Sequence, residues 1–326
     1  MKKIIILFVA VFFSSFFLNG IVMADFKDLS KDNPYFDAII FLKNNNIING
    51  HSDGTFKPND LVNRAEALKI VLIGTGISLD GSFPMPNFSD VKKDDWYIGF
   101  LAKGIKDNIV NGNPDGTFAP GRGVNKAELL KMLLLSAKID LSKHKNLTEA
   151  VSRDVGPSDW FAPYFSYGKT VGIVFPDLNN NLEPGKFLTR GEVAEIVYRL
   201  IITVKGGDAQ KFLSIAESSL VSVLVYLNAN DIENALSSSN NAVFYSEQAL
   251  SLKSEESIVK GAVKVSNAFR ELCYAYKAGL NGNVEELKSF VVNAKKLADE
   301  GLNFNSGLQD LRDRIFEQGD LLLSQI

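Results

Sequence analysis

Residues 111–120 read Asn-Gly-Asn-Pro-Asp-Gly-Thr-Phe-Ala-Pro, and residues 49–58 read Asn-Gly-His-Ser-Asp-Gly-Thr-Phe-Lys-Pro. Aspartate followed by glycine in the middle of such a stretch is typical of a turn, because glycine adopts positive φ without steric cost. We therefore predict a tight loop at each place, with Gly54 and Gly116 in the left-handed conformation. In a weaker third copy the equivalent residue is Asn180, and asparagine tolerates that conformation next best.

The loops belong to a longer repeat that occurs three times without a gap. The copies run from Asp28 to Glu66, from Asp90 to Glu128 and from Asp154 to Glu192. Each has an aspartate, a polar stretch, an apolar stretch with helical spacing, the loop, and the start of a second apolar stretch. The periodicity predicts a helix, a loop and a second helix in every copy.

The second helix of each copy starts with a capping signature. An asparagine or threonine stands three residues before a glutamate, the spacing at which the two side chains bond each other's free backbone N–H groups. We therefore expect the glutamates to be structural. The three pairs are Asn63 with Glu66, Asn125 with Glu128, and Thr189 with Glu192.

A basic residue follows the cap in every copy, as Arg64, Lys126 and Arg190. The helix dipole disfavours a cation in the first turn, so stability alone does not explain these residues. A helix N-terminus that carries a mobile cation is a good site for an anion. The sequence therefore predicts an anion site in each repeat, with a solvated surface cation as the alternative.

Metal and cofactor sites are not expected. A calcium loop needs several oxygen ligands at alternating positions, whereas the loops at 49–58 and 111–120 hold one aspartate each. Asp177 and the asparagines after it leave that alternative open in the third loop. His51 and His144 lie far apart, and Cys273 is the only cysteine, so no histidine site, thiolate cluster or intramolecular disulfide is expected.

Together these motifs resemble S-layer homology (SLH) repeats. The resemblance rests on the aspartate, a tryptophan, the Ile-Ile-Asn-Gly…Asp-Gly-Thr-Phe…Pro loop and an ending similar to Thr-Arg-Ala-Glu, over residues 26–202. It implies a pseudo-threefold helical unit with grooves between neighbouring repeats. It also implies binding of secondary cell-wall polysaccharide, typically through a pyruvylated N-acetylmannosamine that carries a carboxylate.

Position by position, the resemblance makes the three basic residues the partners of that carboxylate. It implies that the leading aspartates, Asp28, Asp90 and Asp154, accept hydrogen bonds from sugar hydroxyls. Trp96 and Trp160 match the family's tryptophan, which stacks on a sugar face, although each can equally be a core residue.

Three departures bear on which grooves are competent. Pro34 stands where the first repeat should have its tryptophan, with Tyr35 beside it. Lys126 replaces arginine and loses the planar, bidentate fork. Pro176 replaces the glycine that the other loops have as Gly50 and Gly112.

The first 24 residues have the features of a secretory signal. Lys2 and Lys3 precede an apolar run from Ile4 to Leu18, and small residues stand before a cleavage point after Ala24. The alternative is a retained N-terminal anchor. Without this segment 33 basic and 38 acidic residues remain, which argues against nucleic-acid binding. We predict a secreted protein at the cell wall.

The sequence after the repeats is of a different kind. Residues 205–208 read as a hinge, and no proline follows it. Apolar periodicity predicts helices near 208–228, 231–252, 256–279, 283–303 and 306–325. A weak match of Ile232-Glu233 with Val284-Glu285 indicates a helical hairpin that occurs twice, and hence an antiparallel bundle.

The predicted organisation is a signal peptide (1–24), three repeats (26–76, 88–138 and 152–202 within 25–206) and a helical bundle (207–326). The last part has no histidine and no phosphate-binding loop, so we expect an interaction or spacer module for another surface protein and no enzyme activity. Two alternatives stay open. One is a surface-attached enzyme with its activity in the bundle, and the other is a component of an S-layer lattice.

Overall fold

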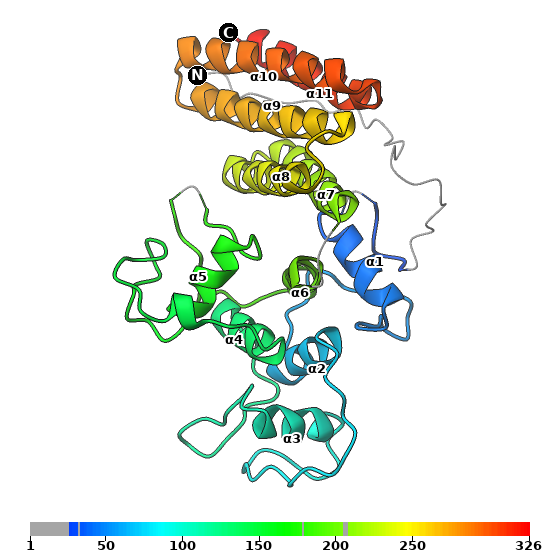
Figure 1. The fold of residues 1–326 in the computed structure, drawn as a ribbon, viewed down its shortest axis with the longest axis vertical. Coiled ribbons are helices and arrows are strands. Elements are labelled where there is room, and N and C mark those ends of the chain that lie inside the picture. Colours follow the sequence, from blue (N-terminus) through cyan, green and yellow to red (C-terminus); the bar gives the residue numbers. More distant parts are fainter. Residues whose placement is uncertain (1–25, 32, 178, 205–207) are drawn as a thin grey trace. The chain divides into compact units, whose positions relative to one another are not determined.

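The computed structural model describes residues 26–31, 33–177, 179–204 and 208–326, and the predicted signal peptide lies outside them. The mainly α fold is confirmed (Figure 1). The described residues form two compact units. We call residues 26–31 and 35–204 the repeat unit, and residues 208–326 the helical unit.

Each repeat contributes two helices to the repeat unit. The first helices are short and are α1 (Phe36–Asn44), α3 (Ile98–Lys106) and α5 (Ala162–Thr170). The second helices begin at the three basic residues and are α2 (Arg64–Gly74), α4 (Lys126–Ser136) and α6 (Arg190–Val204). A single 3-10 turn, η1 (Ser142–His144), precedes the third repeat. The predicted helix–loop–helix blocks are thus confirmed.

The second helices start with the predicted reciprocal caps. The Asn63 side chain accepts from the Glu66 N–H at 2.9 Å, and the Glu66 carboxylate accepts from the Asn63 N–H at 3.0 Å. The other two repeats form the same pair of bonds, between Asn125 and Glu128 and between Thr189 and Glu192. The three glutamates are therefore structural, as expected.

Backbone hydrogen bonds between the starts of these helices close the repeats into a ring. Val62 donates to the carbonyl of Leu188 at 3.0 Å, Leu188 to that of Val124 at 3.1 Å, and Val124 to that of Val62 at 2.9 Å. All three side chains are buried. Because each repeat bonds both of the others in the same way, the unit has the predicted pseudo-threefold arrangement.

The loops adopt the predicted turns. Gly54 and Gly116 both have φ of +81°, and Asn180 has φ of +59°. In the third loop, the Asp177 carboxylate accepts from the backbone N–H groups of Asn179 and Asn181 at 2.9 and 2.7 Å. These bonds are those of a turn.

The structure explains why the third loop has lost its glycine. A Cβ atom on Gly50 would lie 2.3 Å from the Phe26 ring, and one on Gly112 would lie 2.0 Å from the Phe88 ring. These two loops need glycine because a phenyl ring packs on them. The equivalent of the phenylalanine in the third repeat is Ser152. Pro176 therefore accompanies the loss of the ring and does not signal a damaged loop.

The helical unit contains helices at the predicted places. They are α7 (Ala209–Asn228), α8 (Ile232–Leu252), α9 (Ser257–Leu280), α10 (Val284–Phe304) and α11 (Gln309–Leu323), with a 3-10 turn η2 (Ser306–Leu308) before the last. Each helix packs on the next one in the chain, and α11 also packs on α9. The predicted bundle is confirmed.

Small residues let these helices approach closely. A Cβ atom on Gly261 of α9 would lie 3.0 Å from the carbonyl oxygen of Gly301 on α10. Cys273 is completely buried, and its burial raises the pKa of the thiol to about 12, so it packs as a small apolar residue of the core.

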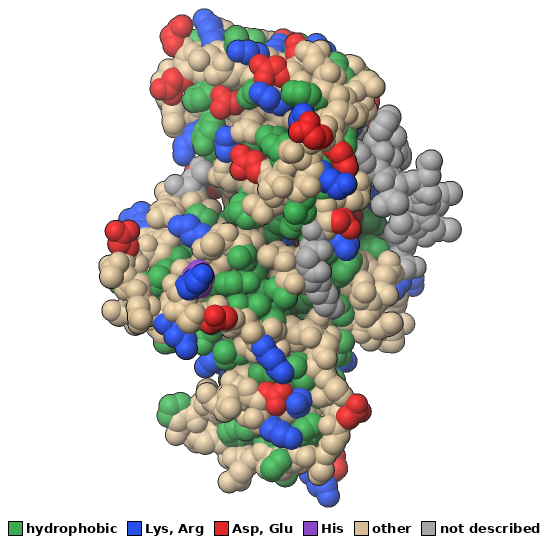
Figure 2. All heavy atoms as spheres, viewed as in Figure 1, with side chains coloured by type: hydrophobic (Ala, Val, Ile, Leu, Met, Phe, Trp, Pro, Cys, Tyr) green, Lys and Arg blue, Asp and Glu red, His purple; other side chains and the backbone are tan. Residues whose placement is uncertain are grey.

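The surface of the helical unit carries mixed charge. Acidic and basic side chains are interspersed over the face of the unit that Figure 2 shows. Ion pairs such as Lys264 with Glu300, at 2.6 Å, account for part of this pattern. Within the described ranges, no helix combines the length and the apolar character that a membrane crossing requires.

Candidate functional site

Each of the three predicted basic residues reaches from its own repeat to the loop of another. We call the contact of Arg190 with loop 49–58 interface 1, that of Arg64 with loop 111–120 interface 2, and that of Lys126 with loop 175–184 interface 3. Each interface joins segments that are far apart in the sequence, so ring closure assembles them.

Arg64 is built into interface 2. Its Nη2 donates to the carbonyl of Asn111 at 2.8 Å, and its Nη1 donates to Glu128 at 3.1 Å. The guanidinium carbon lies 4.8 Å from the centre of the Phe118 ring. Only 8% of the residue is exposed, and burial lowers its pKa from the ordinary value. The alternative of a solvated surface cation is therefore wrong for Arg64.

The other two basic residues make matching contacts. Arg190 donates from Nε to the carbonyl of Phe56 at 2.8 Å and from Nη2 to that of Asn49 at 3.1 Å. Lys126 Nζ donates to the carbonyl of Leu182 at 2.9 Å. Burial lowers the pKa of both side chains. The sequence predicted mobile cations, whereas the structure fixes all three in bonds that hold neighbouring repeats together.

The leading aspartates lie at the base of the loops. Asp28 accepts from the backbone N–H groups of Phe56 and Lys57, both at 2.7 Å. Asp90 and Asp154 make the same two bonds in their own repeats. These aspartates therefore hold each loop in place, and their predicted contact with sugar hydroxyls stays a prediction.

The two tryptophans are surface residues. Trp96 is 56% exposed and Trp160 is 55% exposed, so neither is a core residue. A lysine of the preceding repeat lies against each ring: Lys69 Nζ is 5.6 Å from the centre of Trp96, and Lys131 Nζ is 5.5 Å from that of Trp160. Sequence reasoning missed these lysines. Their signal was the same residue type at equivalent positions of two repeats.

Interface 1 contains a groove of about 250 Å³. Its polar lining brings together Arg190 from the third repeat, Glu66 and Lys69 from the first, and Trp96 from the second. The structure thus places two predicted residues, Arg190 and Trp96, on one groove. Closure of the ring also brings a second cation, Lys69, and a carboxylate, Glu66, to this groove.

The interfaces differ in charge. In interface 2, Arg64 and Arg122 both bond Glu128, so two cations share one carboxylate. In interface 3, two lysines bond two glutamates: Lys126 lies 3.3 Å from Glu183, and Lys186 lies 2.8 Å from Glu192. Interface 2 is therefore the more favourable of the two for an anion.

Interface 3 also lacks the pair of tryptophan and lysine. Pro34 stands at the tryptophan position, and Glu195 stands at the lysine position and pairs with Arg199 at 2.8 Å. The Tyr35 ring packs on Gly191, where an added Cβ atom would lie 2.2 Å from it. Of the three departures noted in the sequence, the loss of the first tryptophan changes its interface most.

Comparison with known proteins identifies the family of the repeats. Residues 25–68, 87–130 and 153–194 match the family profile described as "S-layer homology domain". An amylopullulanase of Thermoanaerobacterium thermosulfurigenes is 31% identical over 179 residues, which are 54% of this chain and 9% of that protein. The surface-layer 125 kDa protein of Lysinibacillus sphaericus is 26% identical over 205 residues, which are 61% of this chain and 17% of that protein.

A third relative is similar over a shorter stretch of the chain. The cellulosome-anchoring protein of Acetivibrio thermocellus is 32% identical over 83 residues, which are 25% of this chain and 19% of that protein. The chain thus spans less than a fifth of the length of each of these three relatives.

Proposed function

Residues 25–194 of this chain are three S-layer homology domains, which anchor it at the cell surface to cell-wall polysaccharide, and we propose that they recognise an anionic, pyruvylated form of that polymer. The helical unit is, in this proposal, an interaction or spacer module that the anchor displays.

The observation that carries the proposal is the groove of interface 1. A pyranose ring presents a face of C–H groups, and the exposed Trp96 offers an aromatic surface for it. Lys69 and Arg190 line the same groove and suit a carboxylate on that sugar, because charge-assisted hydrogen bonds are the strong ones. Glu66 lines it too, and its carboxylate can accept from sugar hydroxyls.

Interface 2 offers equivalent groups. Trp160 and Lys131 stand where interface 1 has Trp96 and Lys69, and Arg122 adds a cation. Interface 3 has no tryptophan at that position, and its lysines pair with glutamates. We therefore propose that interfaces 1 and 2 bind the polymer and that interface 3 mainly holds the ring together.

The helical unit has features of a binding module more than of an enzyme. Glu255 and Glu285, each the first of two consecutive glutamates, have side chains that are 94% and 88% exposed and pair with Lys260 and Lys288. A general acid or base must lie within hydrogen-bond reach of a bound substrate, and side chains that extend this far into solvent are poorly placed for that. We propose no enzyme activity for this unit. Turnover of wall glycans or peptides that is lost in Glu255→Gln or Glu285→Gln would contradict this.

A lattice component is a second candidate, favoured by the similarity to the surface-layer 125 kDa protein. Electron microscopy of the purified protein distinguishes the two. Ordered sheets would support a lattice role, and dispersed particles that still bind walls would support an anchor with a display module.

The anchor is tested by sedimentation of the full chain with purified cell-wall sacculi. We compare the wild type with Lys69→Ala/Trp96→Ala and with Lys131→Ala/Trp160→Ala, each with intact walls and with walls stripped of pyruvate. These side chains are at the surface, so the ring should remain folded. A triple alanine variant of the basic residues would break the ring and could not separate binding from folding.

We expect each double variant to lose part of the binding, their combination to lose most of it, and stripped walls to bind none of the proteins. Lys143→Ala, an exposed change outside the interfaces, is the matched control. Binding that survives in the combined variant would refute the two interfaces as the site. Binding lost in the variants but kept on stripped walls would refute the pyruvate while keeping the site.

A further inference from the structure

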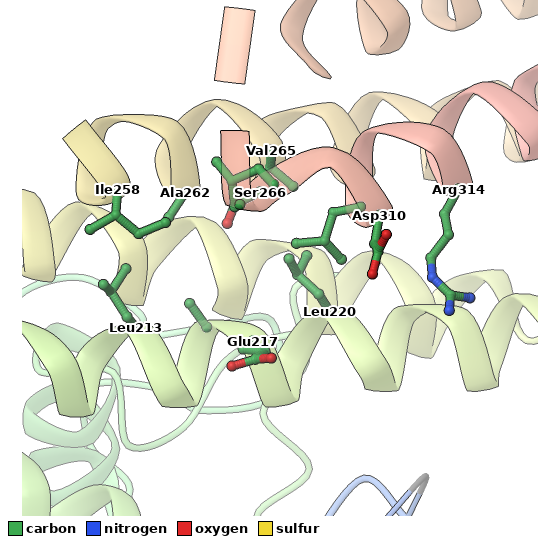
Figure 3. A pocket seen from close by; sticks show the side chains of 13 residues that line it. Leu213, Glu217, Leu220, Ile258, Ala262, Val265, Ser266, Asp310 and Arg314 are labelled. Atoms are coloured by element: carbon green, nitrogen blue, oxygen red, sulfur yellow. The ribbon is translucent and has the colours of Figure 1, made fainter. Parts of the chain in front are cut away.

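The helical unit contains a narrow apolar slot, which lies outside the three interfaces of the repeat unit (Figure 3). It lies between α7, α9 and the segment formed by η2 and the start of α11. In Figure 3 the side chains of α7 face those of α9 across it. Its lining is mostly aliphatic and includes Leu213, Leu220, Ile258, Val265, Leu308 and Leu311.

The slot is small. Its volume is about 60 Å³, whereas an engineered apolar cavity that binds benzene has a volume of about 150 Å³. The space therefore admits the end of one unbranched or lightly branched side chain. An aromatic ring, a sugar or a whole helix is too large for it.

One hydroxyl in the slot has no partner in the part of the chain that the structure describes. Ser266 is 1% exposed, and its Oγ makes no hydrogen bond there. Other buried serines of this unit, Ser219, Ser239 and Ser246, donate to a backbone carbonyl three or four residues earlier, at 2.8 to 2.9 Å. A buried hydroxyl is unfavourable without a partner. We therefore expect a group that occupies the slot to accept a hydrogen bond from Ser266.

The rim of the slot is charged. It carries Glu217 and Asp310 against Arg314. The imbalance extends over the whole unit, since residues 207–326 contain 16 acidic and 11 basic residues. Basic residues on an incoming segment would complement this rim.

We propose that the slot is a docking point for a segment of a partner protein that inserts one methionine side chain flanked by basic residues. Methionine is unbranched and flexible, so it enters a narrow slot, and its sulfur is a weak acceptor for the Ser266 hydroxyl. This inference rests on the proposed role of the helical unit as an interaction module and names the partner's chemistry.

The test uses the full chain in solution and the probe peptide acetyl-Gly-Lys-Met-Lys-Gly-amide, with binding followed by NMR titration. Matched peptides replace methionine by norleucine, alanine or phenylalanine. We expect the methionine peptide to bind at least ten times more tightly than the alanine and phenylalanine peptides. Norleucine has the same shape without sulfur, and we expect it to bind about two to five times more weakly than methionine. In the Ser266→Ala protein, the methionine and norleucine peptides should bind with equal affinity.

Two variants locate the binding. Ala216→Leu fills the slot and should abolish binding, whereas Val292→Leu, the same kind of enlargement on an exposed site of α10, should not. Asp310→Lys at the exposed rim should weaken the lysine peptide at least threefold and strengthen acetyl-Gly-Glu-Met-Glu-Gly-amide. If the Ala216→Leu protein does not fold, the Asp310→Lys variant still tests whether the peptide binds at the slot.

Equal binding of the methionine and alanine peptides would overturn the proposal, as would unchanged binding in a folded Ala216→Leu protein or in Asp310→Lys. Because no wall material is present, failure here leaves the anchor untouched. A protein that pellets with walls yet ignores the peptides would refute only the slot.

Discussion

The repeat unit and the helical unit are both helical, yet different contacts hold them together. In the repeat unit, charged side chains and loop carbonyls join segments as far apart as Asn49 and Arg190. In the helical unit, each helix packs on its neighbour in the chain, and Gly261 and Gly301 let α9 and α10 approach closely. Hydrogen bonds between residues far apart in the sequence thus hold the ring together. In the bundle, the contacts are mainly between helices that follow one another in the chain.

The units also differ in charge. Residues 25–206 contain 22 acidic and 22 basic residues, whereas residues 207–326 contain 16 acidic and 11 basic residues. Both tryptophans, Trp96 and Trp160, lie in the repeat unit. Tryptophan fluorescence therefore follows the unfolding of the ring alone, while circular dichroism follows both units.

The largest effect is expected when a ring arginine is removed. Arg64→Ala leaves the Asn111 carbonyl without its side-chain partner and leaves Glu128 with Arg122 alone, and we expect a loss of about 3–5 kcal/mol in the free energy of unfolding. Urea titration followed by tryptophan fluorescence measures it. Arg312→Ala, a surface arginine of the helical unit, should leave that curve unchanged. Equal losses in both variants would show that the two units unfold as one.

A smaller loss is expected in a loop. Gly112→Ala puts a Cβ atom against the Phe88 ring, which should cost about 1–3 kcal/mol through overpacking. The double variant Phe88→Ser/Gly112→Ala copies the change seen in the third repeat. Because removal of the ring removes the clash, its loss should be less than the sum of the single losses. Strict additivity, in the same fluorescence titration, would contradict this account of Pro176.

Acid should weaken the ring through its loop clamps. Burial opposes ionisation of Asp28 and Asp154, but backbone hydrogen bonds outweigh it, and the pKa of each is lowered from 3.8. A lowered folded-state pKa gives stability that is present above pH 3.8 and is lost as pH falls through the folded value. We expect fluorescence-detected stability to fall below about pH 4. Asp154→Asn should lose about 1 kcal/mol at pH 7 and show a flatter acid response.

The smallest effect on stability is expected at the aromatic surface. Lys131 is only partly buried and lies against the exposed Trp160, so Lys131→Ala should change the unfolding free energy by less than about 0.5 kcal/mol. The same variant should reduce wall binding measurably. A stability loss as large as that of Gly112→Ala would instead make Lys131 a structural residue of the ring.

Much of the fold was predictable because its signals are local. The Asp-Gly and Asn turns required positive φ at residues 54, 116 and 180, and all three have it. The capping spacing predicted where α2, α4 and α6 begin. In the helical unit, apolar periodicity and turn residues placed each helix to within a few residues, although the last one starts with the 3-10 turn η2.

The candidate site was only partly predictable. The three basic positions were visible as a repeated exception to the helix-dipole preference, but their partners were not. Asn49 and Phe56 lie more than 130 residues from Arg190, and no local pattern pairs them. The lysines beside the tryptophans were missed because each pair is formed between neighbouring repeats.

The sequence by itself determined the repeat, the turns, the caps and the helices, because hydrogen bonds and apolar spacing within a few residues specify each of them. Only the tertiary structure decided which loop each basic residue meets, that Trp96 and Trp160 are exposed, and that the three interfaces differ in charge. The physical reason is that these properties arise when the chain closes on itself through the backbone bonds among Val62, Val124 and Leu188.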